Sequence, residues 1–497
     1  MPEKSTTQPL REQRLARVQA LRAKGSDPYP ARVERTDSAF DLRARFQALD
    51  AGQTTVNRAC VAGRVMSVRN SGMFLDLYDG TAKLQLFLPI EGRDPSLAAV
   101  LADIDLGDFV SASGVVRRTK RGELTLDVDS LRVIVKALLA PPEKFHGLTN
   151  TELRYRQRYV DLIANETTRN TLLTRFRLVA AIRGYLTRAG YLEVETPMLQ
   201  PIYGGATARP FTTHHNVLDM ELYLRIAPEL YLKRLLVGGL SDKLFELNRN
   251  FRNEGITTKH NPEFTMLEVY HAYGDMTTMM DLLAAMIPEV VMQATGSTRV
   301  SCGGATIDLQ DGFRKVSMVG EASRALGIDV STADLASVRG AIEQHTGVPI
   351  DDGESWGALV QLAFESFVEG QLQEPTHVVD FPADVSPLAK RSPADPRIAE
   401  RFETYCFGME IANAFSEMND PIAQRAIFEA QAASATDDGE TPREVDEDFL
   451  TALEYGMPPA GGLGLGIDRL AMIASGTSSI REVIAFPTLR PTGGQPK

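Results

Sequence analysis

Residues 243–270 hold a charged loop between two apolar runs, and this segment restricts the fold more than any other part of the chain. The loop opens with Arg-Asn-Phe-Arg-Asn-Glu-Gly at residues 249–255, so two arginines and a glutamate follow a run typical of a strand. A strand–loop–strand unit directs such charges into one space, and arginine offers a planar fork suited to phosphates and carboxylates. The pattern therefore predicts a hairpin that binds an anion, with a solvated hairpin of ordinary charge pairs as the alternative.

A second segment, residues 461–470, reads as a glycine-rich strand that leads into an apolar helix. Glycines at alternate positions, 462, 464 and 466, leave one face of the strand without side chains, so a planar group can lie against the backbone. Arg469 follows at the start of the helix, where free amide groups favour anions. Tight packing of a helix on a strand explains a glycine run equally well, and the spacing differs from that of a dinucleotide fingerprint or a P-loop. The two segments together are far more specific than either alone.

Together these segments resemble the motifs of class II aminoacyl-tRNA synthetases, and within that class those of the bacterial-type lysyl-tRNA synthetases (class IIb). Residues 243–270 are similar to motif 2, and residues 461–475 are similar to motif 3. A helix that ends near Gly190 and the apolar and acidic residues after it are similar to motif 1, at about 172–199. The resemblance covers residues 58–490 and implies an antiparallel β-sheet flanked by helices. Motif 1 contributes to the dimer interface in this family, so a homodimer is also implied.

Charge and cysteine content limit the class of protein. The 497 residues carry a formal net charge of −12, and the three cysteines, Cys60, Cys302 and Cys406, lie far apart. Their spacing speaks against a disulfide framework or a structural zinc site. The chain has neither a run of about 18 apolar residues nor an apolar signal core, so we expect a cytoplasmic protein without a membrane partner. The negative charge speaks against a non-specific coat on nucleic acid but allows a specific RNA partner bound by a local basic patch.

Four regions are expected along the chain, and the fold class is α+β. The first region has amphipathic helical spacing and is interpreted as an appendage packed on the next domain, with an RNA-contacting arm as the alternative. Five short strand-like runs, with a helical patch after the third, then predict a five-stranded OB-fold β-barrel. The expected boundaries are 1–57 for the helical appendage, 58–140 for the OB-fold anticodon-binding domain, 141–159 for a linker and 160–497 for the class II catalytic domain, with an inserted helical subdomain at about 290–375.

One hairpin of the expected barrel carries aromatic and polar side chains on its outer face. Leu75 and Leu77 share the inner face of one strand and Phe74 lies on the outer face, where Gln85 of the next strand also lies. Exposed aromatic rings beside hydrogen-bonding groups can stack and read single-stranded bases. The resemblance implies that Phe74 and Gln85 bind the anticodon, with Arg69 as a further anticodon-binding residue. The alternative is that aromatic rings of this face tuck under a loop.

The charges expected around an amino-acid pocket favour lysine. A bound lysine brings an ammonium group that is costly to bury unless it is paired, and the segments near the motifs supply carboxylates. An aspartate- or asparagine-specific relative would need a cation or an amide instead, and any single glutamate read alone is most often a surface charge. Under the resemblance, Glu229 and the Gly205 backbone bind the α-amine, Asn413 and Arg252 bind the carboxylate, Glu417, Tyr270 and Glu268 bind the ε-ammonium, and Phe415 forms an apolar wall.

The resemblance also implies an ATP site with magnesium. Glu403 and Glu410 would bind Mg²⁺ that bridges the phosphates of ATP, because magnesium binds through one or two carboxylates plus substrate phosphates. Read alone, the two glutamates fit two faces of a solvated helix equally well. The catalytic residues would be Arg252, Glu254 and Arg469. The ATP-binding residues would be Arg252, Glu254, His260, Phe264, Gly466 and Arg469.

The implied activity is that of a lysine–tRNA ligase. Such an enzyme activates L-lysine with ATP to lysyl-adenylate and transfers lysine to the 3′ end of tRNA(Lys), with release of AMP and pyrophosphate. Two other functions stay open at this point. A related ligase that modifies a protein would lack the OB domain, and an inactive RNA-binding paralogue would not need Arg252, Glu254 and Arg469.

Overall fold

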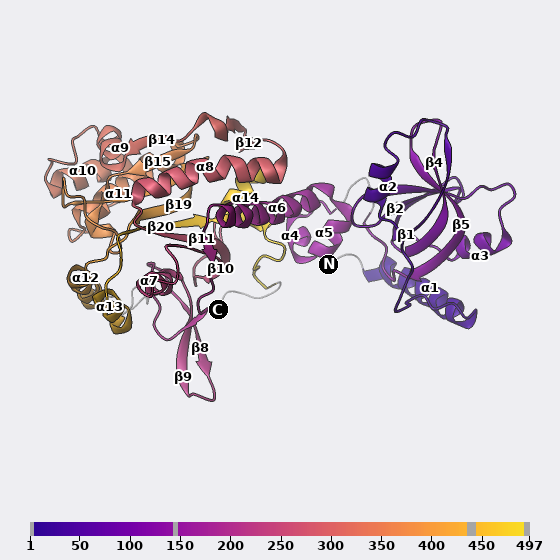
Figure 1. Cartoon of the computed structure of the whole chain (residues 1–497), viewed down its shortest axis with the longest axis horizontal. Coiled ribbons are helices and arrows are strands. Elements are labelled where there is room, and N and C mark those ends of the chain that lie inside the picture. The colour runs from indigo at the N-terminus through magenta and orange to yellow at the C-terminus, as the bar shows by residue number, and fades with distance from the viewer. Residues whose placement is uncertain (1–3, 143–147, 435–443, 492–497) are drawn as a thin grey trace. The chain divides into compact units, whose positions relative to one another are not determined.

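The computed structural model describes residues 4–142, 148–434 and 444–491, and the chain divides into two compact units, residues 1–149 and 150–497 (Figure 1). The expected appendage, linker and catalytic domain each include a few residues outside the described ones. These residues are 1–3, 143–147, 435–443 and 492–497.

The first unit is a closed five-stranded barrel with strand order β1-β2-β3-β5-β4, which confirms the predicted OB-fold barrel. Its core follows from alternation along the strands, because successive side chains of a strand point to opposite faces. Leu75 and Leu77 are fully buried inside, whereas Phe74 on the outer face is half-buried. A short helix follows the third strand, as the sequence predicted. The barrel elements are β1 (Thr54–Arg69), β2 (Phe74–Tyr78), β3 (Lys83–Phe87), α3 (Pro95–Ala102), β4 (Phe109–Arg118) and β5 (Leu124–Val135).

Two helices, α1 (Lys4–Ala23) and α2 (Ala39–Arg45), pack on this barrel. Arg14 of α1 is buried and donates to the carbonyl oxygens of Ala137, at 2.7 Å, and Leu106, at 3.1 Å. Helix α2 begins at Ser38, whose side chain accepts a hydrogen bond from the Asp41 amide, a standard N-cap. The bonds of Arg14 hold α1 on its own unit, and Ala39 and Leu42 bury α2 in the barrel core.

The second unit is built on an eight-stranded sheet in the order β14-β15-β18-β19-β20-β11-β10-β6. The pairs β14/β15 and β6/β10 at the two edges are parallel, and every other neighbouring pair is antiparallel. This agrees with the predicted class II sheet. In sheet order the strands are β14 (Arg314–Ser317), β15 (Thr376–Val379), β18 (Arg401–Cys406), β19 (Met409–Ser416), β20 (Ala460–Gly466), β11 (Glu263–Ala272), β10 (Lys243–Phe251) and β6 (Leu192–Glu193).

The two faces of this sheet have different neighbours. Leu267 and Val269 of β11 belong to the main hydrophobic core, together with residues of α6 (Glu166–Arg188), α8 (Met276–Thr295) and α14 (Ile467–Ser475). Figure 1 shows these three helices along the sheet. The residues between, such as Glu268, point to the opposite face and line a cavity. The two-residue period of the strand therefore separates the core from the site.

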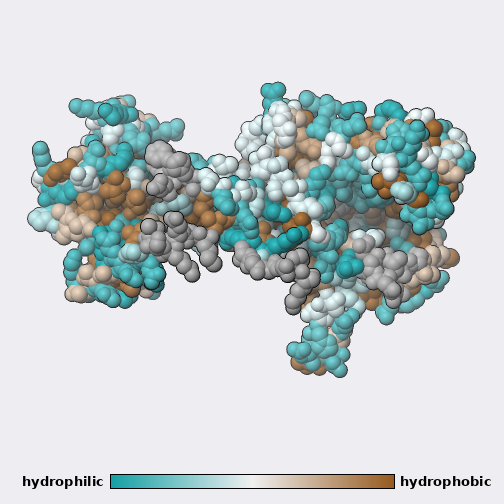
Figure 2. Space-filling model, turned by 180° about the vertical axis from the view of Figure 1, so that it is seen from behind, coloured by the Kyte–Doolittle hydropathy of each residue, from teal (hydrophilic) through white to brown (hydrophobic). Residues whose placement is uncertain are grey.

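The remaining elements surround this sheet. Helices α9–α11 share a hydrophobic cluster of their own that includes Met318 and Phe364. No helix in the described part of the chain is long and apolar enough to cross a membrane, and hydrophilic residues predominate on the face of the second unit seen in Figure 2. The remaining helices are α4 (Thr151–Arg156), α5 (Arg158–Ala164), α7 (Glu229–Val237), α9 (Met318–Leu326), α10 (Leu335–Thr346), α11 (Trp356–Phe367), α12 (Pro421–Ser434), α13 (Glu447–Glu454) and α15 (Ile480–Val483). The short strands are β7 (Leu199–Gln200), β8 (Phe211–His215), β9 (Met220–Leu224), β12 (Arg299–Cys302), β13 (Ala305–Asp308), β16 (Phe381–Pro382) and β17 (Ile398–Ala399).

Candidate active site

A cavity of about 750 Å³ lies on the face of the large sheet opposite the helices α6, α8 and α14. Strands β11, β18, β19 and β20 supply its floor, and α7 and the loop after β10 supply its sides. The structure brings into this one cavity all the residues that the sequence assigned to amino acid, ATP or magnesium. They are Gly205, Glu229, Arg252, Glu254, His260, Phe264, Glu268, Tyr270, Glu403, Glu410, Asn413, Phe415, Glu417, Gly466 and Arg469.

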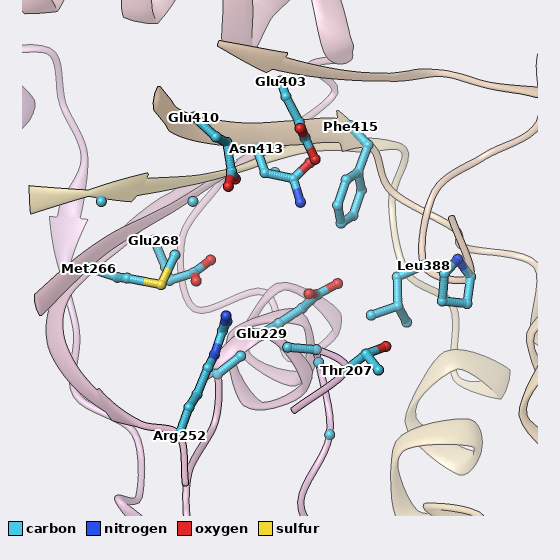
Figure 3. Close-up of a pocket in the computed structure, with 18 of the residues that line it drawn as sticks. Thr207, Glu229, Arg252, Met266, Glu268, Leu388, Glu403, Glu410, Asn413 and Phe415 are labelled. Carbon is cyan, nitrogen blue, oxygen red and sulfur yellow. The ribbon is translucent and has the colours of Figure 1, made fainter. Parts of the chain in front are cut away.

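Three buried carboxylates, those of Glu229, Glu268 and Glu417, gather at one end of the cavity. In Figure 3 the carboxylates of Glu229 and Glu268 point into the same space as the guanidinium of Arg252. Burial, with the nearby Glu229 and Glu417 carboxylates adding to it, raises the pKa of Glu268 well above its usual range. Burial also raises the pKa of Glu417 to about 8. A cluster that holds its protons this strongly is suited to a cationic ligand, which stabilises the ionised carboxylates.

Close approach to glycine backbone makes room for these carboxylates. A Cβ atom on Gly462 would lie 1.7 Å from Oε1 of Glu417, and a Cβ atom on Gly464 would lie 3.4 Å from Oε1 of Glu268. The glycine-bearing face of β20 was interpreted from the sequence as a bed for a planar group. At these two positions that interpretation is wrong, because side chains fill the space: Glu417 at Gly462, and Met266 together with Glu268 at Gly464, where the Cβ atom would lie 2.9 Å from Cε of Met266.

Arg252 lies at the border between the carboxylate cluster and the rest of the cavity. Its guanidinium sits over the ring of Phe264, with 5.1 Å from the guanidinium carbon to the ring centre. Burial lowers the pKa of Arg252, and its buried Nε has no hydrogen-bond partner among the described residues. A cation with a buried and unused donor atom indicates a site for an anionic group.

Arg469 begins the helix after β20 and contacts two other predicted residues. Its Nη1 lies 3.0 Å from Oε2 of Glu410, and its Nη2 lies 3.1 Å from Nε2 of His260. Burial and the positive charge of Arg469 lower the pKa of His260, so His260 is neutral at pH 7 and its Nε2 can accept a hydrogen bond. Glu254 also lines this part of the cavity.

Glu403 and Glu410 lie on neighbouring strands of one hairpin, β18 and β19, so the alternative of two faces of a solvated helix is wrong. Glu403 accepts hydrogen bonds from Arg401 at 2.6 Å and from the Tyr405 hydroxyl at 2.5 Å. Burial and the neighbouring Glu410 raise the pKa of Glu403 to about 7. No group of three or more His, Cys, Asp or Glu side chains placed to bind a metal occurs among the described residues. Glu403 and Glu410 fit a cation that is held by these two carboxylates and by oxygens of a bound ligand. Such a cation would relieve the repulsion between the two carboxylates.

The predicted anticodon-binding residues form a second cluster on the outer face of the barrel. Arg69 donates to Asp76 at 2.7 Å and to Oε1 of Gln85 at 3.1 Å. The Gln85 amide nitrogen donates to Thr125 Oγ1 at 3.0 Å. The guanidinium carbon of Arg69 lies 5.8 Å from the ring centre of Phe74. Gln85 lies on the outer face with Arg69, but it is buried there, because the side chains of Arg69 and Thr125 cover it from both sides.

Comparisons with known proteins match both units. An OB-fold nucleic acid binding domain matches residues 59–134, and the tRNA synthetases class II (D, K and N) match residues 150–490. The curated lysine–tRNA ligases of Sinorhizobium medicae and Pelotomaculum thermopropionicum are both 47% identical to this chain; the matches cover 96% and 97% of this chain and 96% and 94% of those proteins. The lysine–tRNA ligase of Agrobacterium fabrum is 46% identical, over 97% of this chain and 96% of its own length. The chain belongs to the lysine–tRNA ligase family.

Two basic residues of this family member were missed by the sequence reasoning. Arg401 lines the cavity and donates to Asn413 Oδ1 at 3.0 Å as well as to Glu403. Lys233 of α7 is fully buried beside Glu229 and Glu417. The signal for Lys233 was available, since it follows Glu229 by four residues and therefore shares its helix face. The sequence around Arg401 has no such spacing that would have indicated its place in the site.

Proposed function

We propose that this chain activates L-lysine with ATP and transfers it to tRNA(Lys). The observation that carries this proposal is the gathering of three buried carboxylates and an arginine with an unused donor in one cavity. The carboxylates suit the two ammonium groups of lysine, and the arginine suits its carboxylate. An aspartate or asparagine side chain would meet carboxylates where it needs a cation or an amide.

The amino acid is held along the cavity by residues from four elements. Glu229 and the Gly205 backbone bind the α-ammonium; Gly205 packs against Glu229, since a Cβ atom there would lie 3.1 Å from the Glu229 Cβ. Arg252 and Asn413 bind the carboxylate. The ε-ammonium is bound by Glu417, Glu268 and Tyr270, with Phe415 as an apolar wall.

Activation in this arrangement needs no side-chain nucleophile. The lysine carboxylate attacks the α-phosphorus of ATP in line and expels pyrophosphate, so catalysis consists of positioning and charge stabilisation. Arg252 bridges the lysine carboxylate and the α-phosphate, and its unused Nε supports this role. Arg469 binds the γ-phosphate with His260 nearby. Phe264 stacks on the adenine and Glu254 accepts a hydrogen bond from its amino group, while Gly466 leaves room for the nucleotide.

Glu403 and Glu410 would hold a magnesium ion in this proposal. When bound, magnesium neutralises charge on the phosphates of ATP. Arg401 and Tyr405 orient the Glu403 carboxylate through the hydrogen bonds given above, and Arg469 does the same for Glu410. The two carboxylates therefore face the cavity with their geometry already fixed by the protein.

Transfer of lysine requires tRNA, and the barrel supplies a matching surface. Phe74 stacks on an anticodon base and Gln85 and Arg69 contact its edges, after Gln85 exchanges the intramolecular bonds of the free protein for bonds to the base. The terminal ribose hydroxyl of the tRNA then attacks the adenylate in the catalytic unit, giving lysyl-tRNA and AMP. Because its substrates are those of translation, we place the enzyme in the cytoplasm.

A homodimer is also proposed, on the basis of exposed apolar side chains in motif 1. Leu173 and Phe176 of α6 are 40% and 55% exposed, and three further apolar residues of this motif, Leu192, Met198 and Leu199, are 44–46% exposed. Apolar residues concentrated in one segment favour a contact with another protein surface. A second copy of this chain presents the same segment, as an interface with two-fold symmetry requires.

Amino-acid-dependent ATP–pyrophosphate exchange tests the proposed function. The assay is run with each of the twenty amino acids in turn, and lysine should support exchange at least ~10⁴-fold better than leucine or methionine, because buried carboxylates would be left unpaired by those side chains. Charging of tRNA(Lys) with the preferred amino acid follows as the second step. A preference for aspartate or asparagine, or exchange without charging of any tRNA, would contradict the proposal.

A further inference from the structure

Lys233 is a fully buried cation in the wall of the amino-acid pocket. Its Nζ lies 2.6 Å from Oε1 of Glu229 and 2.5 Å from Oε2 of Glu417, and 5.6 Å from the ring centre of Phe415. The described residues that line the cavity include both glutamates but leave out Lys233. Lys233 therefore touches the carboxylates from behind and is separated from a bound amino acid by them.

The remaining oxygens of the two glutamates are left for a ligand. Oε1 of Glu417 is buried against Gly462 and has no hydrogen-bond partner among the described residues. Oε2 of Glu229 faces Gly205, where a Cβ atom would lie 3.7 Å from it. Each carboxylate thus presents one oxygen to Lys233 and keeps a second oxygen that Lys233 does not contact.

When all three carboxylates of the pocket are ionised, its charges balance only if Lys233 is counted. The ionised cluster carries three negative charges, those of Glu229, Glu268 and Glu417. A bound lysine brings only two ammonium groups. The charge of Arg252 does not help, because the carboxylate of the substrate neutralises it. We propose that Lys233 is a positioning residue that neutralises one charge of the cluster and so matches the pocket to a ligand with two ammonium groups. This inference rests on the proposed placement of lysine in the cavity.

Electrostatics around Lys233 agrees with a permanent positive charge. Burial lowers the pKa of Lys233, but the adjacent carboxylates of Glu229 and Glu417 raise it by more, so that it stays an ammonium group. Burial raises the pKa of Glu229 and Lys233 counteracts this effect. Lys233 lowers the pKa of both Glu229 and Glu417, so without it these two carboxylates would hold their protons more tightly and pair less readily with the substrate. The other titratable or charged groups that face the cluster are Tyr270, Arg252, Arg401 and Glu246.

The test is Lys233→Met, which keeps the length of the side chain and removes its charge. We expect the KM for lysine in pyrophosphate exchange to rise at least ~10-fold at pH 7, since one unit of pKa corresponds to a tenfold change, while the KM for ATP stays within about twofold. The ratio of variant to wild-type KM for lysine should fall as the pH rises towards 9, because the extra proton then leaves the cluster. Lys233→Arg keeps the charge and should keep the wild-type pH profile. Lys243→Met on β10, outside the cavity, is the control and should behave as wild type.

A double-mutant cycle with Glu417→Gln separates charge matching from a packing role. Where Glu417 has lost its charge, Lys233→Met should raise the KM for lysine by a much smaller factor than in the wild type. In the Glu417→Gln background, Lys233→Met leaves one fewer unpaired carboxylate buried. The double variant can therefore still be compared if Lys233→Met alone folds poorly. An equal factor in both backgrounds, or a KM ratio independent of pH, would overturn the role of Lys233. If Glu417→Gln alone kept the wild-type affinity for lysine, the pocket assignment itself would be wrong, whatever Lys233 does.

Discussion

Arginines with buried guanidinium nitrogens differ in this protein in whether those nitrogens have a partner. Arg225 lies 2.8 Å from Glu246, and Arg158 lies 2.8 Å from Asp161; both arginines are buried, and removal of either partner would leave an unpaired charge. Arg252 instead keeps a buried Nε without a partner among the described residues. A folded protein tolerates such an unpaired donor where a ligand supplies the missing acceptor. The presence or absence of a protein partner therefore distinguishes structural arginines from an arginine proposed to bind a ligand.

Replacement of Arg252 by alanine tests this distinction. Arg252→Ala should lower lysine-dependent pyrophosphate exchange at least ~10²-fold, the usual effect of losing one preorganised donor to a developing charge. The melting temperature should change little, because no protein partner of Nε is lost. Arg249→Ala, on β10 just before the loop that holds Arg252, lies outside the cavity and serves as the matched control. Near-normal exchange by Arg252→Ala would remove Arg252 from the proposed mechanism.

His377 provides a pH test at the residue scale, away from the cavity. Its ring stacks on Phe313 with 4.9 Å between ring centres, and burial lowers its pKa to about 4. Below pH 6.5 the unfolded chain gains a proton on this histidine that the folded protein does not bind, so stability is lost as the pH falls towards 4. The full effect is about 3 kcal/mol. His377→Gln should therefore flatten the decrease in melting temperature between pH 7 and pH 4.5.

Exposed His345 is the matched control for this experiment. His345→Gln replaces an exposed histidine, and the variant should keep the wild-type pH slope of the melting temperature. A slope for His377→Gln equal to that of the wild type would mean that the buried ring is not a source of acid sensitivity.

At the scale of elements, the cavity and the outer face of the barrel are built in the same way. In each, one face of a strand packs in a hydrophobic core, and the other face carries the side chains of the proposed site. In β11 the core face holds Leu267 and Val269, and the other face holds Glu268. In β2 the core face holds Leu75 and Leu77, while Phe74 lies outside. Because the core fixes the strand, the positions from which the side chains of the other face project are fixed as well.

The outer face of the barrel can be tested separately from the cavity. Phe74→Ala together with Gln85→Ala should weaken tRNA charging by roughly 10-fold or more, since stacking alone is worth about 1–3 kcal/mol per base. Pyrophosphate exchange should stay unchanged, because it does not involve tRNA. Phe40→Ala removes an exposed aromatic ring elsewhere in the same unit and is the control. Equal losses of charging and exchange would identify this face as a stability element.

At the scale of the whole molecule, each unit has a hydrophobic core of its own. The barrel core contains Leu84 and Val110, and the core of the second unit contains Phe245 and Leu283. Separate cores allow the two proposed tasks to be divided between units, with anticodon contacts in one and adenylate chemistry in the other. Exposed apolar residues of α6 are not used by either core and are available for the proposed contact between copies.

The proposed dimer is tested by Phe176→Glu on α6. A charge placed at a half-exposed position should weaken an apolar interface, and light scattering should show a shift from dimer towards monomer at micromolar concentration. Val348→Glu, at an exposed apolar position in the helical part of the second unit, should leave the mass unchanged. A monomeric wild-type protein, or a dimeric Phe176→Glu variant with undiminished stability, would rule out α6 as the interface.

Sequence alone determined the local pattern of this protein, because periodicity and composition act over a few residues. The alternation at Leu75 and Leu77 predicted the inner face of the barrel, and the motif resemblance indicated the large sheet and the lysine–tRNA ligase family. The tertiary structure decided which charges meet. It placed Glu403 and Glu410 on one hairpin, when a helix was equally compatible with their spacing.

It also buried Gln85 beneath Arg69, filled the glycine-bearing face of β20 with glutamates, and set Lys233 between Glu229 and Glu417. Glu229 and Glu417 belong to distant segments, and their approach depends on the packing of α7 against the sheet. The ion pairs of Lys233 with the two glutamates depend on the whole fold, since electrostatic interactions depend on distance in space and on burial. Local sequence carries neither quantity.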